Sequence, residues 1–130
     1  MTIRLLGRAP SFVTVRDVAG VLTADSAVLS DANYPLTDSV EGFGGAPGIA
    51  VSWYTTGGTP HALDSLDLQL LFRDNRAQWI EGPTRLGVLK NTIVTFRTEN
   101  CTAVYLRIVS VLSLLTASGL IVRAASAFDA

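Results

Sequence analysis

The sequence predicts an all-β protein, a single antiparallel β-sandwich, with a jelly roll as the first choice of topology and an immunoglobulin-like sandwich as the second. Three observations lead to this fold class. Short runs of residues alternate between apolar and polar side chains, which is typical of strands. Turn-forming residues separate these runs about every ten residues, and no helical pattern alternates with them. The chain has 130 residues, which is enough for one domain, 1–130, with its own core.

The first predicted strands cover 11–15 and 48–56. In 11–15, two pairs of side chains alternate. In 48–56, Ile49, Val51 and Trp53 share one face of the strand, and Ala50, Ser52 and Tyr54 share the other. Trp53 therefore belongs with the aliphatic side chains, and we expect it in the core.

The clearest alternation covers 66–72. Leu66, Leu68, Leu70 and Phe72 point one way, and Asp67, Gln69 and Leu71 point the other. The turn residues 73–76 follow, because Asp and Asn bond their own backbone and tolerate turn geometry. The sequence predicts a hairpin whose second strand, 77–80, ends at the segment 81–83. Another strand is predicted at 93–97, with Val94 and Phe96 on one face.

The most apolar stretch, 104–126, raises the question of a membrane span. A spanning helix needs about 20 mostly apolar residues. The apolar run between Arg107 and Arg123 is shorter than that, and the residues 116–119 (TASG) in its middle are typical of a turn. Alternation with a period of two is visible on both sides of that turn. The stretch therefore predicts two adjacent strands, and no membrane span.

The N-terminal third gives a less regular pattern. Residues 14–17 could form a helix capping box, and the apolar positions of 15–29 fit a helix only loosely, so helix and strand both remain open there. Residues 30–48 are rich in Gly, Pro, Asp and Ser, which favours a long loop or extended arm within the one domain.

Composition favours a chain that associates through its surface. Hydrophobic residues make up 48% of the chain and charged residues 16%, below the roughly one-quarter typical of soluble domains. We expect part of the surface to be buried in a homo-oligomer or against another protein. Candidates lie on the second faces of strands, on aromatic positions and in the arm; they are Leu71, Val109, Ile121, Tyr54, Trp79 and Phe43. The net charge of −1 gives no case for nucleic acid.

The residues that usually carry chemistry are scarce. His61 is the one histidine and Cys101 the one cysteine, too few for a zinc site, and nothing in the spacing brings the two together. The glycine-rich 42–48 lacks the Lys-Ser/Thr ending of a phosphate loop. The N-terminus does not read as a signal peptide. We therefore expect no catalytic, cofactor-binding or metal-binding residues.

Three segments carry a resemblance to a known group: NTIVTFRTEN, TAVYLRIVSV and GLIVRAAS. Their strand rhythm and composition resemble the last strands of β-sandwich structural proteins of tailed bacteriophages, of the capsid decoration (cement) type. The resemblance covers at most 66–125. It implies a virion protein, a homo-oligomeric trimer or dimer that clamps neighbouring capsid subunits and has no catalytic residues. The arm at 30–48 would suit a loop that grips a partner.

Two other functions fit the sequence. A carbohydrate-binding β-sandwich would present an exposed aromatic strip that includes Trp79 or Tyr54. A small enzyme would unite His61 with Cys101 or with an acidic residue in one cleft. Of the three functions, we expect that of a structural assembly protein first.

Overall fold

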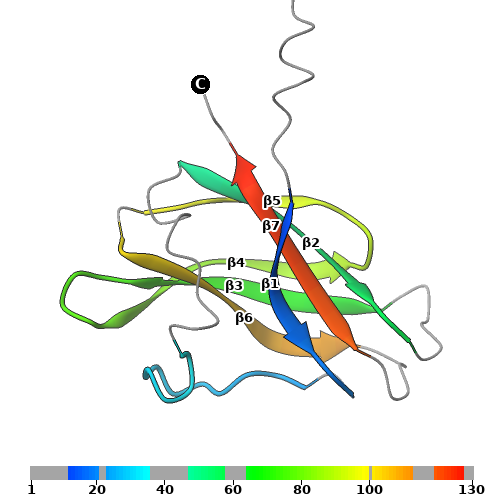
Figure 1. The fold of residues 1–130 in the computed structure, drawn as a ribbon, viewed down its shortest axis with the longest axis horizontal. Coiled ribbons are helices and arrows are strands. Elements are labelled where there is room, and N and C mark those ends of the chain that lie inside the picture. Colours follow the sequence, from blue (N-terminus) through cyan, green and yellow to red (C-terminus); the bar gives the residue numbers. More distant parts are fainter. Residues whose placement is uncertain are drawn as a thin grey trace, which may run out of the picture.

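The computed structural model describes residues 12–20, 23–35, 47–57, 64–99, 101–112 and 119–127 (Figure 1). These residues form seven strands and contain no helix. The strands are β1 (Val13–Val18), β2 (Gly48–Thr55), β3 (Ser65–Arg73), β4 (Trp79–Leu89), β5 (Val94–Arg97), β6 (Ala103–Leu112) and β7 (Leu120–Ala127). Two antiparallel sheets pack face to face, so the predicted all-β sandwich is confirmed.

The strand order is that of a jelly roll with one strand missing. Sheet A has the order β1-β7-β2-β5, and sheet B has the order β4-β3-β6. A jelly roll has eight strands in two sheets. The seven strands can be matched to that topology. The first and last strands, β1 and β7, are neighbours, as in a jelly roll. The strand that is absent is the second one, which would follow β1 in the chain and lie beside β6.

Residues 23–35, here called the strap, take the place of that missing strand. Their path runs along the side of sheet B (Figure 1). The Asp25 backbone N–H donates to the Ile108 carbonyl at 2.8 Å, and the Ile108 N–H donates to the Asp25 carboxylate at 2.7 Å. The free edge of β6 is therefore capped at this point by a side chain and a backbone group. The helix that remained possible over 15–29 is not formed: the strand runs to Val18, and the described residues beyond it are irregular.

The core between the sheets contains the side chains that alternation assigned to it. Ile49, Val51 and Trp53 of β2 face Leu66, Leu68, Leu70 and Phe72 of β3, and the inward residues of β6 and β7 complete the cluster. The Trp53 indole Nε1–H donates to the Val88 carbonyl at 2.9 Å, so its polar atom is satisfied inside the core. The predicted facing of these strands is confirmed.

The hairpin of β3 and β4 is longer than predicted. The expectation that the second strand ends at 81–83 was wrong, because β4 continues to Leu89. β4 is an edge strand. One side of an edge strand has no neighbouring strand, so a proline can be accommodated there without loss of a hydrogen bond between strands. The pairing also shifts register between Gln69 and Leu71, which accommodates Gly82 and Pro83 in the strand.

The apolar stretch 104–126 contains the two predicted strands, β6 and β7, joined through residues outside the described part at 113–118. The two strands lie in different sheets, so the chain crosses from one layer of the sandwich to the other between them. Within the described residues, there is no helix of the length and apolarity that crossing a membrane would require.

Candidate functional site

The strap covers an aromatic cluster on the outer face of sheet B. Tyr34 of the strap is fully buried and packs edge-on against Tyr105 and Trp79, with ring centroids 5.0 and 6.3 Å apart. Leu71 lies in the same cluster, and Leu29 packs against it. The Tyr34 hydroxyl donates to the Ser26 carbonyl within the strap, and burial raises the pKa of this phenol. The cluster forms a second, smaller core outside the sandwich.

Charged groups fasten the strap at two points. At the first, Asp31 accepts a hydrogen bond from Trp79 Nε1 at 2.6 Å and pairs with Arg73 at 3.0 Å. The bond from Arg73 lowers the pKa of Asp31 below its ordinary value. At the second, Arg16 of β1 pairs with Asp25 at 2.6 Å, and its guanidinium carbon lies 5.4 Å from the centroid of the Tyr105 ring.

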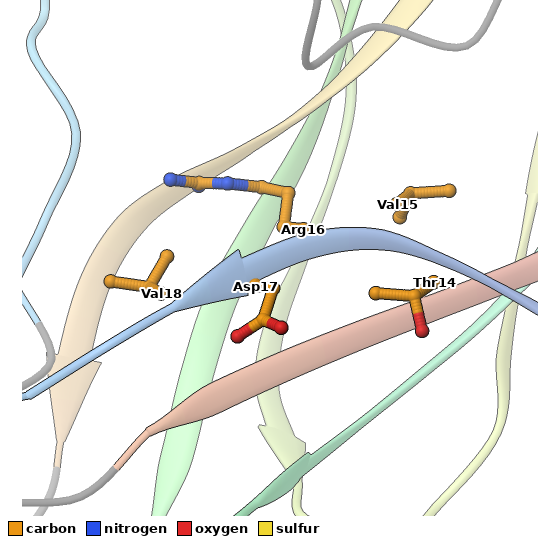
Figure 2. Close-up of a pocket in the computed structure, with 5 residues that line it drawn as sticks. All are labelled: Thr14, Val15, Arg16, Asp17 and Val18. Carbon is orange, nitrogen blue, oxygen red and sulfur yellow. The ribbon is translucent and has the colours of Figure 1, made fainter.

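A shallow pocket of about 260 Å³ lies along β1, lined by Thr14–Val18 (Figure 2). Figure 2 shows Val15, Arg16 and Val18 on one side of the strand and Thr14 and Asp17 on the other. The bulge between Thr14 and Arg16 produces this arrangement. Since Arg16 is directed to Asp25 and to the Leu106 carbonyl, its charge holds the strap in place and is engaged within the fold.

Three of the predicted interface residues are already buried in the single chain. Leu71, Trp79 and Ile121 are 0, 6 and 8% exposed. The expectation that Leu71 and Ile121 are buried only in an oligomer or by a partner was therefore wrong. The strap covers Leu71 and Trp79. Ile121 lies between Asp17 and Tyr54 on the neighbouring strands of sheet A.

The other predicted interface residues have different positions. Tyr54 is exposed on sheet A, and Val109 is half-buried on β6. Their role in an interface stays a prediction. Phe43 and most of the arm at 30–48 lie outside the described residues. A carbohydrate-binding module would need an exposed aromatic strip, and Trp79 is not available for one because the strap covers it.

Among the described residues, Cys101 is the candidate nucleophile. It is half-buried and lines a pocket of about 350 Å³ that also contains Phe72, Glu81 and Glu99. Burial raises the pKa of the thiol, which disfavours the nucleophilic thiolate. His61 lies outside the described residues. In the described ranges, no group of three or more His, Cys, Asp and Glu side chains could hold a metal ion.

Large apolar side chains are exposed at one end of sheet B. Leu86 and Leu112 are 77 and 70% exposed, and Leu89 is 42% exposed. Leu89 of β4 and Leu112 of β6 both pair with Ser65 of β3, which lies between them, so the two leucines project from the same face of the sheet. Leu89 and Leu112, here called the leucine surface, were not among the predicted interface residues. Their exposure depends on strand pairing that the sequence does not reveal.

On the outer face of sheet A, Ala50, Ile121 and Ala125 are buried, and Tyr54 is exposed. Arg123 is paired with Thr14 on one side and with Ser52 on the other. A pocket of about 220 Å³ lies around it, lined by Phe12, Ser52, Tyr54, Ile93 and Arg123. The Arg123 guanidinium donates to the Phe12 carbonyl at 2.7 Å, and none of the ion pairs among the described residues involves it.

The arrangement as a whole is a jelly-roll sandwich in which the strap covers part of the outer face of sheet B and leaves Leu89 and Leu112 exposed. Comparison of the chain with protein-family models, with curated proteins and with solved structures found no match. The function of the chain is therefore inferred from its surfaces.

Proposed function

We propose that this chain is a non-enzymatic structural protein of a virion, of the capsid decoration type, which forms homo-oligomers and binds a capsid protein. The observation that carries the proposal is the leucine surface. Leu89 and Leu112 lie on either side of Ser65 of β3, on the same face of sheet B, and both are exposed in the single chain. Exposed apolar residues that gather in one place are typical of contact with another protein.

The edge of sheet B beside this surface is protected against unspecific strand pairing. β4 carries Pro83, a register shift on either side of Leu68–Gln69, and Gly87 at a φ of 63°. Prolines and bulges are the means by which natural proteins prevent edge-to-edge aggregation. We therefore expect association through side chains on the sheet faces rather than by addition of a strand to β4.

The chemistry of the described residues also supports a binding role. The half-buried Cys101 has a raised pKa, the charged groups of the strap are engaged in structural ion pairs, and the aromatic cluster is covered. What this chain offers to a partner is apolar area, which contributes roughly 25 cal/mol per Å² removed from water before the costs of ordering.

The test uses the double variant Leu89→Thr/Leu112→Thr, since threonine keeps β propensity while removing apolar area. Binding is measured by co-sedimentation with empty capsids of the virion to which this proposal assigns the chain. The matched control is Val28→Thr, at an exposed apolar residue on the strap that is not part of the leucine surface. We expect the double variant to lose about tenfold or more in capsid affinity and the control to bind like the wild type. Wild-type binding by the double variant contradicts the proposal.

A further inference from the structure

A carboxylate lies on the same face of sheet B as the leucine surface. Asp67 of β3 is two residues from Ser65, the residue that pairs with both Leu89 and Leu112. The residues on either side of Asp67 point into the core, so its own side chain points away from the core, as that of Ser65 does. From strand geometry, the Cα atoms of Asp67 and Leu112 are roughly 8 Å apart. The carboxylate is therefore adjacent to the leucine surface.

Both neighbouring strands hold this carboxylate in position. Asp67 Oδ1 accepts a hydrogen bond from the Gly87 N–H of β4 at 2.8 Å, and Oδ2 accepts one from the Ser110 hydroxyl of β6 at 2.5 Å. The two oxygens of a carboxylate offer about four lone-pair sites. Each oxygen of Asp67 can therefore accept a further hydrogen bond, and the side chain is half-buried, so a group from outside can reach it.

The ion pairs among the described residues do not include Asp67. Arg107 of β6 is the neighbouring cation on this face, because it pairs with Gln69. Its guanidinium is 3.1 Å from Gln69 Oε1 and 3.2 Å from Glu81 Oε1. Glu81 is opposite Leu71, further along β3 from Asp67. Arg107 is therefore directed away from Asp67.

The neighbouring cation on β4 is also engaged elsewhere. Arg85 donates to the Thr95 carbonyl of β5 at 3.1 Å, and β5 belongs to the other sheet. The negative charge of Asp67 is therefore available to a cation from another molecule.

We propose that Asp67, Leu89 and Leu112 form one binding site, and that its ligand is a segment of the capsid protein in which a Lys or Arg side chain is flanked by apolar side chains. The basic group bonds to the carboxylate, an arginine by two parallel hydrogen bonds. The apolar side chains and the aliphatic stem of the basic residue pack against the two leucines. The apolar contact contributes affinity, and the ion pair restricts which segment binds. This inference rests on the proposed function and names the chemistry of the partner.

The test removes the charge of Asp67 and keeps its hydrogen bonds. In Asp67→Asn, the amide can still accept from the Gly87 N–H and can donate to the Ser110 hydroxyl. Binding is measured by co-sedimentation with the same empty capsids over a series of NaCl concentrations. We expect the variant to bind about tenfold more weakly than the wild type at low salt, and the difference to shrink as salt screens the ion pair. Asp17→Asn removes the same charge at an exposed position on sheet A and should bind like the wild type.

A second variant separates the charge of Asp67 from its structural role. Ser110→Ala removes one hydrogen bond to the carboxylate but leaves its charge, and it should bind like the wild type. Thermal melting verifies that each variant is folded. Equal binding by Asp67→Asn and the wild type at every salt concentration overturns this inference, as does an equal loss in Ser110→Ala.

The same assay distinguishes this inference from the proposed function. If Leu89→Thr/Leu112→Thr loses binding while Asp67→Asn does not, the proposed function remains supported and only the basic partner is wrong. A wild type that does not bind capsids contradicts both proposals.

Discussion

Asp31 accepts a hydrogen bond of 2.6 Å from the indole of Trp79, a residue 48 positions further along the chain. This bond joins the strap to β4, and the same carboxylate pairs with Arg73 of β3. The Asp31 side chain therefore attaches the strap, which replaces a strand of the jelly roll, to both β3 and β4. The strap thereby covers the aromatic cluster on the outer face of sheet B.

The first prediction concerns acid stability. The pKa of Asp31 is lowered in the folded chain, chiefly by the bond from Arg73, so its charged form is favoured by folding. The stabilisation is present at neutral pH, above the pKa of the unfolded chain, and is lost as the pH falls below about 4 and through the folded pKa. The variant Asp31→Asn should show a smaller loss of unfolding free energy between pH 6 and pH 3, as measured by urea denaturation. An equal loss in both proteins would show that this carboxylate does not contribute.

The second prediction concerns Tyr34, the residue that anchors the strap in the aromatic cluster. Tyr34→Ala should reduce the free energy of unfolding by about 3 to 5 kcal/mol, as expected for a buried aromatic residue. Tyr34→Phe removes only the bond to the Ser26 carbonyl and should cost about 1 kcal/mol. Val28→Ala, on the exposed side of the strap, is the control. A cost below about 1 kcal/mol for Tyr34→Ala would mean that the strap is not docked in solution.

The third prediction concerns Gly82, where β4 approaches β3 closely. A Cβ atom at this position would overlap the Phe72 ring and lie 2.9 Å from the Leu70 carbonyl oxygen. Gly82→Ala should therefore destabilise the protein by about 1 to 3 kcal/mol. Gly57→Ala is the matched control, since a Cβ there would meet no atom within 4 Å. Denaturant melts of the two variants should differ clearly. Equal stability would argue against the register described for the hairpin.

Alternation predicted the inner faces of the strands well, because a half-buried strand must place every second residue in the core. Ile49, Val51 and Trp53 are examples. It could not assign the outer faces. Leu71 reads as an outward residue, and it is one, yet the strap buries it. The sequence of the strap fits a helix only loosely, and the bonds that dock it join residues far apart in the chain.

The end of β4 was missed for a related reason. Glu81-Gly82-Pro83 reads as a strand terminator, and it would be one in the middle of a sheet. At an edge, the same residues are tolerated, and edge or centre is decided by the pairing of strands distant in sequence. The leucine surface and the Arg123 pocket were missed likewise, because neighbours such as Leu89 and Leu112 meet only through β3.

The fourth prediction concerns Cys101. Burial raises the pKa of its thiol, so a smaller fraction is thiolate at pH 8 than in a free cysteine. Its reaction with a thiol reagent should be slower in the native protein than in the urea-unfolded chain, and the native rate should rise with pH across the range where the unfolded rate levels off. A native rate equal to the unfolded rate would place the thiol in solvent.

We propose that this chain works by associating through its exposed side chains. The most direct test is sedimentation equilibrium of the wild-type protein over a series of concentrations. We predict a mass that is a multiple of the 13.8 kDa chain and that falls toward 13.8 kDa on dilution. A mass of 13.8 kDa at every concentration would contradict self-association.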